Sequence, residues 1–320
     1  MSKLTVVITD NGPAGVELEQ KILGDAGFEV IAGQCKTAED VIEIAADADA
    51  LMVGGAPITA DVIAALTRCK MIIRCGVGVD CIDVQAATAK GIAICNVPDA
   101  TTNEVADHTL ALALSWGRQL PAIDKRVRQG EWDITADLVM PAFQDMTFAT
   151  VGFGNIARAV MERAKVFKFR LIATDPEVAD EEFTRLGVER MELDAVIAQA
   201  DILSLHPPLT PETQHMINAQ RFAQMRRGVI LINAGRGELV DTGALLDALR
   251  SRHVAYAGLD VFEEEPLPAA HPLCSLHNIL LTPHAAAYSD RSGPVVIRMA
   301  CEEVVRALRG EALKAQVNKQ

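Results

Sequence analysis

The stretch 147-TFATVGFGNIARAVMERAKVF-167 decides the fold of this chain. It opens with an apolar run of strand length, passes through the pattern G-x-G-x-x-A and continues as a helix-forming segment. Gly152 permits a tight turn, Gly154 lets the backbone approach a pyrophosphate, and Ala157 is small enough for a helix to pack closely on a sheet. Free N–H groups at the helix start, together with the helix dipole, attract an anion. The stretch therefore predicts a dinucleotide-binding turn.

The next strand separates this interpretation from that of an ordinary tight turn, which a glycine pattern alone allows. An apolar run at 171–174 ends at Asp175, 21 residues beyond Gly154. A carboxylate at this place can accept hydrogen bonds from the adenosine ribose hydroxyls and repels a 2′-phosphate. The spacing therefore favours NAD over NADP, with a solvated strand-end residue before Pro176 as the alternative.

The rest of the chain alternates strands and helices, which is typical of doubly wound parallel α/β sheets. In the first hundred residues we expect strands at 4–8, 28–32, 50–53, 71–75 and 92–95, and helices near 14–26, 37–47, 59–67 and 82–90. In the second half we expect strands near 147–151, 170–174, 201–205, 229–233, 254–259 and 279–282. These six strands would complete a dinucleotide-binding sheet.

Three further segments organise the chain, whose 320 residues favour two domains over one. Residues 101–117 predict a long buried helix that connects the domains. Residues 118–144 lack a clear period, and we expect a further helix and then a loop. Apolar side chains recur at helical spacing in 289–309, which predicts a last helix that packs on the first domain.

The composition argues against several classes of partner. The chain has 30 basic and 43 acidic side chains, and its formal charge of −13 repels polyphosphate and leaves no basic face for nucleic acid or anionic lipid. No apolar stretch approaches the length of a membrane span, and the first residues do not have the pattern of a signal peptide. We expect no nucleic-acid or membrane partner, so any anionic ligand must be held by local groups.

The seven cysteines are odd in number and lie mostly in apolar segments, which is typical of reduced core residues in a cytoplasmic protein. Cys69, Cys75 and Cys81 are separated by even gaps that could suggest a metal site. No CxxC pair or Cys/His finger spacing accompanies them, so we expect no metal.

Polar side chains follow three predicted strands downstream of the glycine turn. Arg236 follows the strand at 229–233, three acids at 263–265 follow the next strand, and His284 follows the last. Open α/β sheets bind ligands at the carboxyl ends of their strands, and an arginine, a carboxylate and a histidine at one edge form a catalytic composition. The alternatives are a histidine that caps a structural turn and an acidic run that is merely solvated.

Motifs along nearly the whole chain resemble the D-isomer-specific 2-hydroxyacid dehydrogenases, a family that includes phosphoglycerate dehydrogenases, hydroxypyruvate reductases, formate dehydrogenase and the C-terminal binding protein corepressors. The resemblance rests on these three strand ends and on residues 74–83, 96–99, 105–108 and 206–210; within the family, 97–99 and 282–289 look closest to the corepressor branch. It implies two doubly wound parallel-sheet domains: a Rossmann NAD domain at 99–287, inserted in a flavodoxin-like substrate-binding domain at 1–98 and 288–320.

By this resemblance, the catalytic arginine, glutamate and histidine of the family fall on Arg236, Glu265 and His284. An imidazole that titrates near neutrality can take the hydroxyl proton or return it. A carboxylate beside the ring orients it and favours its protonated form. The planar fork of an arginine can grip a substrate carboxylate and polarise its carbonyl. The implied activity is hydride transfer between NAD and a small 2-hydroxy or 2-keto acid.

The resemblance also implies the remaining contacts and a homodimer through the cofactor domain. The substrate carboxylate would be bound, from the first domain, by the backbone N–H groups of Gly76, Val77 and Gly78, so that the substrate lies between the domains. Asp260 would hold the nicotinamide carboxamide. Together with Gly152, Gly154 and Asp260, the implied cofactor contacts are Thr102, Asn155, Ile156, Asp175, His206, Pro207, Thr213, Ala234, Arg236 and His284.

Three positions depart from the family pattern. Cys81 stands where asparagine is common, Ala157 replaces the third glycine, and Ala287 stands where corepressors carry a large aromatic, which suggests a pocket not built to stack an aromatic substrate. Two other functions are alternatives. The first is an NAD-sensing corepressor-like protein, against which Ala287 and the intact set of Arg236, Glu265 and His284 argue. The second is a formate dehydrogenase, which typically pairs its histidine with a glutamine, whereas this chain has Glu265. The sequence leaves open which acid is the substrate and in which direction the reaction runs.

Overall fold

The computed structural model describes residues 3–10, 12, 15–132 and 140–319. The chain divides into two compact units, Met1–Thr101 with Ser289–Gln320, and Thr102–Tyr288. These bounds differ by a few residues from the predicted divisions, which fall after residue 98 and before residue 288.

The first unit contains five parallel strands in the order β2-β1-β3-β4-β5, the flavodoxin-like order. The strands are β1 Thr5–Ile8, β2 Glu29–Ala32, β3 Ala50–Val53, β4 Met71–Arg74 and β5 Ala93–Cys95. The helices are α1 Glu17–Asp25, α2 Ala38–Ala45, α3 Ala60–Ala65, α4 Val84–Ala89 and α12 Ser292–Arg309.

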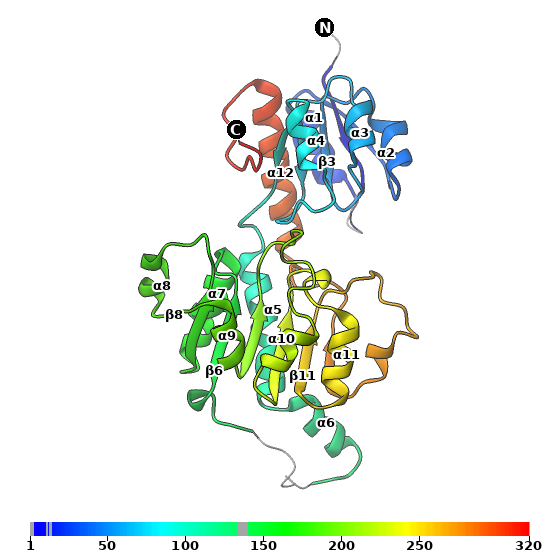
Figure 1. Ribbon diagram of the computed structural model, residues 1–320. Coiled ribbons are helices and arrows are strands. Elements are labelled where there is room, and N and C mark those ends of the chain that lie inside the picture. The colour runs from blue at the N-terminus through cyan, green and yellow to red at the C-terminus, as the bar shows by residue number, and fades with distance from the viewer. Residues whose placement is uncertain (1–2, 11, 13–14, 133–139, 320) are drawn as a thin grey trace. The chain divides into compact units, whose positions relative to one another are not determined.

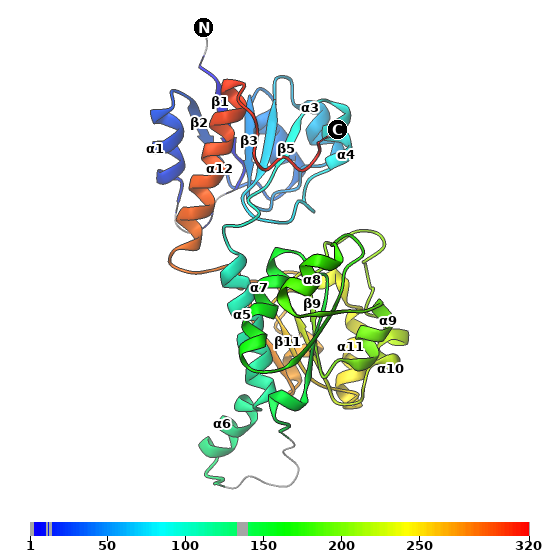
Figure 2. The same cartoon turned by 90° about the vertical axis from the view of Figure 1, so that its left-hand side faces the viewer.

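Alternating side chains of this sheet form two apolar layers. Val7 and Leu51 pack with α2, α3 and α4, whereas Val6 and Met52 pack with α1 and α12 on the other face. Figure 2 shows α1 and α12 on one side of the sheet and α3 and α4 on the other. The last helix therefore returns to the first unit, as its apolar spacing predicts.

The second unit is a parallel sheet in the order β12-β11-β10-β9-β6-β7-β8, which is the Rossmann order extended by one strand. The strands are β6 Thr147–Val151, β7 Arg170–Thr174, β8 Glu189–Arg190, β9 Ile202–Leu205, β10 Val229–Asn233, β11 Val254–Leu259 and β12 Ile279–Leu281. The prediction of six strands is wrong by one, because the edge strand β8 has only two residues and both are polar.

Helices cover both faces of this sheet (Figure 1). On one face lie α5 Thr102–Gly117, α7 Asn155–Val166 and α8 Asp180–Leu186, and on the other α9 Leu193–Gln199, α10 Ala219–Gln224 and α11 Thr242–Arg250. The central strands β6, β9 and β10 are buried at every position, which explains why they read as continuous apolar runs. The predicted fold class, with two doubly wound parallel sheets, is confirmed.

The region 118–144 contains the expected helix, α6 Leu120–Arg128, which extends away from the sheet (Figures 1 and 2). Part of the loop expected after it lies outside the described residues. None of the seven cysteines, all of which the structure describes, forms a disulfide. Among the described helices, none is both long and apolar enough to cross a membrane.

Candidate active site

The glycine turn at the end of β6 has a geometry that only glycine can adopt. Gly152 has φ +88°, and a Cβ placed on it would lie 2.7 Å from the backbone carbon of His206. The close approach arises because His206 N donates to Val151 O, which joins the end of β9 to the end of β6. Both the left-handed backbone and the neighbouring chain therefore require hydrogen at this position.

The start of α7 has room for an anionic group. Gly154 is the N-cap, no described side chain caps the helix, and a Cβ on Gly154 would meet no atom within 4 Å. Ala157 is fully buried, as the small-residue position of the pattern requires. Thr102, at the start of α5, has a buried hydroxyl with no hydrogen-bond partner among the described residues. Open space beside uncapped N–H groups suits the pyrophosphate of NAD.

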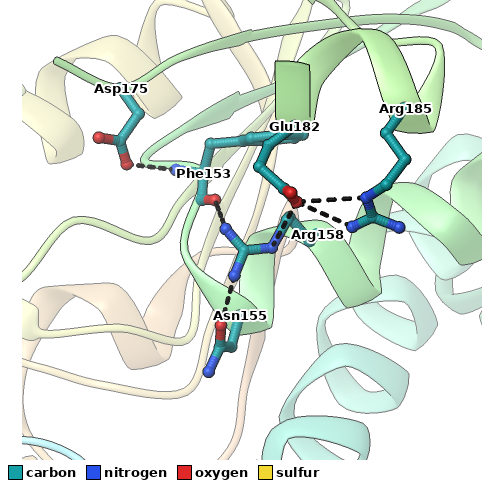
Figure 3. Close-up of polar contacts among 6 residues, drawn as sticks. All are labelled: Phe153, Asn155, Arg158, Asp175, Glu182 and Arg185. Atoms are coloured by element: carbon teal, nitrogen blue, oxygen red, sulfur yellow. Dashed lines mark hydrogen bonds and ion pairs between the residues drawn. The ribbon is translucent and has the colours of Figure 1, made fainter. Parts of the chain in front are cut away.

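Asp175 lies at the end of β7, directly beside the glycine turn (Figure 3). Its Oδ2 accepts a 2.7 Å hydrogen bond from Phe153 N, and its Oδ1 accepts one of 2.9 Å from Glu177 N. Each carboxylate oxygen can accept a second bond, so ribose hydroxyls remain possible donors. Asp175 thus holds the turn in place besides presenting a negative charge at the expected position.

Arg158 is a feature of this turn that the sequence reasoning missed. Its guanidinium donates to Phe153 O and Asn155 Oδ1, and its Nε lies 4.0 Å from Glu182 Oε2 (Figure 3). Glu182 is also hydrogen bonded by Arg185, which lowers the pKa of Glu182. The only available signal was that Arg158 directly follows the glycine pattern.

The other predicted cofactor residues follow the ends of the same strands. Ile156 lies in the first turn of α7, and Pro207 and Ala234 follow β9 and β10. Thr213 is bonded within its own loop, where its hydroxyl donates to Pro208 O at 2.7 Å.

His206 follows β9 and contacts the hydroxyl of Ser204, with 2.8 Å between Nε2 and Oγ. Burial lowers the pKa of His206 to about 4, so its ring is neutral near pH 7. It therefore cannot serve as a cationic acid at neutral pH, which is compatible with its predicted role as a cofactor contact.

Hydrogen bonds tie together the ends of β10, β11 and β12. Asp260 N donates to Asn233 O, Thr282 N donates to Leu259 O, and His284 N donates to Asp260 O. These bonds continue the parallel pairing beyond the last strand residues, so the three polar loops leave one edge of the sheet. The edge is the carboxyl end, which also carries the glycine turn.

The turn that carries Arg236 is shaped by a buried side chain. Asn233 Nδ2 donates to Arg236 O at 2.8 Å, and Asn233 Oδ1 accepts from Gly235 N at 3.1 Å. A Cβ on Gly237 would overlap the backbone of Phe262, so this turn packs directly on the loop that follows β11. Arg236 is therefore held next to the acidic loop.

Glu265 and His284, two of the predicted catalytic residues, are in direct contact. His284 Nδ1 lies 2.7 Å from Glu265 Oε2, and Glu265 Oε1 accepts a 2.9 Å bond from Phe262 N. An ionised carboxylate only accepts hydrogen bonds, so Nδ1 carries a proton and Nε2 is the atom left to exchange one. Both side chains are accessible, at 46% for His284 and 34% for Glu265.

The neighbouring acid Glu263 has a different role. It accepts hydrogen bonds from His215 and from Thr242 N, which lies at the start of α11. Burial opposes ionisation of this carboxyl, but these hydrogen bonds outweigh it and lower the pKa of Glu263. Glu265, the residue that matches the family, is thus the acid of this run that the structure places against His284.

Asp260 is buried, and its carboxylate is hydrogen bonded to the loop around His284. Its Oδ1 accepts from Thr282 Oγ1 at 2.6 Å and from Ala285 N at 2.8 Å, and its Oδ2 accepts from Ala286 N at 2.8 Å. Counting partners among the described residues, Oδ2 has capacity for one more donor, such as a carboxamide N–H. The side chain is only 1% exposed, so most of its capacity serves the protein itself.

In the first unit, the predicted substrate loop follows β4. Gly76 N donates to Arg74 O at 2.9 Å, so this N–H is bonded within the loop. A Cβ on Gly76 would overlap Nη1 of Arg74, because the guanidinium lies directly over the glycine. Because Gly76 has no side chain, the guanidinium of Arg74 can lie against the backbone of this loop.

The sequence pattern of the NAD binding domain of D-isomer specific 2-hydroxyacid dehydrogenases matches residues 110–286. The glyoxylate reductase of Korarchaeum cryptofilum is 38% identical over 285 residues, which cover 88% of this chain and 86% of that protein. The chain belongs to this family. The matched residues are the part that binds NAD in the family, and they contain the glycine turn, Asp175 and the three predicted catalytic positions.

Other relatives differ from the chain in length or in sequence. The D-3-phosphoglycerate dehydrogenase of Methanocaldococcus jannaschii is 38% identical over 301 residues, which cover 93% of this chain and 57% of that protein. The chain thus spans about half the length of the phosphoglycerate dehydrogenases that it matches. The structure of D-lactate dehydrogenase from Aquifex aeolicus, complexed with NAD and lactic acid, has a TM-score of 0.88 at 27% identity, with 96% of each chain covered.

Proposed function

We propose that this protein is an NAD-dependent dehydrogenase of a small D-2-hydroxy acid, or equally a reductase of the 2-keto acid. The observation that carries the proposal is the 2.7 Å contact between His284 Nδ1 and Glu265 Oε2 at the sheet edge that also carries the glycine turn. A histidine oriented by a carboxylate beside a dinucleotide site is the arrangement that hydride transfer to a carbonyl requires.

Bound NADH supplies the hydride, and the side chains of the chain supply the proton. Because Nδ1 of His284 is committed to Glu265, Nε2 is the atom that donates a proton to the keto oxygen, or removes it from the alcohol. Glu265 orients the ring for this proton transfer through its contact with Nδ1. Its second oxygen is fixed by Phe262 N, so the carboxylate is itself oriented.

In the second unit, the substrate carboxylate is assigned to Arg236. A guanidinium can hold a carboxylate with two parallel hydrogen bonds. In the first unit, the loop at 76–78 is a separate candidate for binding an anionic group. Gly76 N is already bonded to Arg74 O, so the N–H groups of Val77 and Gly78 are the proposed donors. The guanidinium of Arg74, which lies over Gly76, adds positive charge to that loop.

NAD is favoured over NADP by the charges around Asp175. Arg158 faces Glu182, and Arg190 is paired with Asp180 while it also donates to the carbonyl of Asp175. Both arginines therefore have acidic partners, whereas the Asp175 carboxylate would repel a 2′-phosphate.

The substrate is proposed to be one of the small acids named for the relatives. They include glyoxylate, 3-phosphoglycerate and lactate. The exposed side chains of His284 and Glu265 are compatible with a small polar substrate. The seven free thiols suit a reducing compartment, and we place the protein in the cytoplasm.

The test is a screen of 2-keto acids for NADH consumption by the purified protein. Glyoxylate, hydroxypyruvate, pyruvate and phosphohydroxypyruvate are offered with NADH and, separately, with NADPH. We expect NADH-dependent reduction of at least one acid. Absence of NADH binding, or of turnover with any of them, would refute the proposed activity.

A homodimer through the second unit is the proposed assembly. An open apolar groove between α5 and α7 is lined by Leu110, Leu114, Val166 and Phe167, and Val166 is 78% exposed. Exposed apolar patches of this kind mark interaction surfaces. We expect light scattering to give twice the chain mass of 34.3 kDa, Val166→Asp to give the single mass, and the control Glu39→Lys in the first unit to leave the dimer intact. A monomeric wild-type protein would contradict this assembly.

A further inference from the structure

The loop that carries His284 is held in a conformation that it would not adopt alone. His284 has φ +52°, in the left-handed region that favours glycine. A residue in this region persists only where its surroundings fix it firmly. The ring position of His284 therefore depends on whatever holds residues 282–286.

Asp260 is the immediate holder of that loop. Its backbone carbonyl accepts from His284 N at 2.8 Å, and its carboxylate accepts from Thr282 Oγ1, Ala285 N and Ala286 N. These contacts lie before, at and after the strained residue. An ionised carboxylate with this many donors makes the strong, charge-assisted kind of hydrogen bond.

A histidine from a different element completes this arrangement. His108, on α5, has its Nε2 3.0 Å from Thr282 Oγ1 and 3.6 Å from Asp260 Oδ1. Thr282 has a single hydroxyl proton, and the 2.6 Å contact with Asp260 Oδ1 commits it to the carboxylate. His108 Nε2 must therefore carry a proton and donate it to Thr282, which gives a one-directional chain from His108 through Thr282 to Asp260.

We propose that His108 is a positioning residue for His284. By donating to Thr282, it fixes the rotamer in which the hydroxyl bonds Asp260, and Asp260 then holds the loop with His284 in place. Hydrogen bonds in such a chain polarise and strengthen one another. The inference rests on the proposed function for its catalytic consequence, but the state of the loop can be measured without any activity.

The first test compares variants that keep or remove the donor. His108→Gln places an amide N–H near the position of Nε2, whereas His108→Leu removes the donor, and Thr282→Ser and Thr282→Val form the same pair for the hydroxyl. We expect kcat for keto-acid reduction to fall on the order of tenfold in the Leu and Val variants, with KM for NADH within about twofold of wild type. The Gln and Ser variants should recover most of the loss. Equal kcat in all four variants would overturn the proposal.

The second test is amide hydrogen exchange at Ala285 and Ala286, whose N–H groups bond Asp260. We expect exchange at these two amides to accelerate by about tenfold in the Leu and Val variants, and to stay near wild type in the Gln and Ser variants. Unchanged exchange in both the Leu and the Val variant would refute the role of His108. A wild-type protein that reduces no keto acid would refute the proposed function instead, and the exchange result would still decide the role of His108. If His108→Leu fails to fold, the Thr282 pair decides.

Discussion

Replacing Glu265 with glutamine should slow keto-acid reduction by removing the acceptor that orients His284. His284 Nδ1 lies 2.7 Å from Glu265 Oε2. Glutamine has nearly the shape of glutamate and preserves packing, because its amide oxygen can still accept from Phe262 N. Its amide nitrogen then faces His284 Nδ1 and cannot accept a hydrogen bond from it, so the orienting contact is lost.

The size of the loss follows from the kind of contact and its exposure. A hydrogen bond to a charged group contributes about 1.5–3 kcal/mol. His284 is 46% exposed and Glu265 is 34% exposed, so solvent screening places the contact at the lower end. A loss of about 1.5 kcal/mol in the transition state corresponds to about a tenfold lower rate.

The assay is kcat for keto-acid reduction at saturating NADH and keto acid, measured for wild type and Glu265→Gln. We expect kcat of the variant to be about tenfold lower. Glu263→Gln is the matched control, since Glu263 bonds His215 and Thr242 rather than His284, and its kcat should stay near that of wild type. Equal kcat for wild type and Glu265→Gln would remove Glu265 from the mechanism.

Substitutions at three other positions test separate parts of the site. Asp175→Ala should weaken NADH binding by about tenfold and reduce the preference for NADH over NADPH. Asp175→Asn keeps an acceptor for Phe153 N, so it should reduce the same preference with a smaller loss of NADH affinity. An unchanged ratio of NADH to NADPH affinity would refute the contact between Asp175 and the ribose. In the folded protein the pKa of His206 is about 4, below its ordinary value of 6.5, so its contribution to the free energy of unfolding is complete above pH 6.5 and is lost as the pH falls toward 4. In urea unfolding, the free energy of unfolding of wild type should therefore fall by up to about 3 kcal/mol over this range, and that of His206→Gln should lack this part of the fall. Parallel curves of unfolding free energy against pH for the two proteins would contradict this prediction. Arg236→Lys should lower kcat/KM for the keto acid by about a hundredfold, because lysine has no planar fork, and a loss of less than about threefold would argue against bidentate binding.

The sequence predicts the architecture well because its signals are local. β6, β7, β10 and β11 have the predicted bounds, since a buried parallel strand is a continuous apolar run between turn residues. β8 escapes prediction because two polar residues at a sheet edge have no apolar period. The three strand-end motifs could be placed at one edge because parallel strands all end on the same side.

What the sequence could not supply is which polar groups satisfy one another. Asp260 is a lone acid after a strand in the sequence, yet its carboxylate is buried under Thr282 and two backbone N–H groups. Arg158 belongs to the turn only because its guanidinium returns to Phe153 O. Contacts of this kind depend on side-chain direction across elements distant in the sequence, and a residue pattern does not encode them.

A single turnover of His284→Asn with NADH and the best keto acid tests the assignment of the proton donor most directly. We expect the rate of NADH oxidation to fall on the order of a thousandfold while NADH still binds, because the variant lacks a group that can deliver the proton. A rate within about twofold of wild type, at saturating NADH and keto acid, would contradict that assignment.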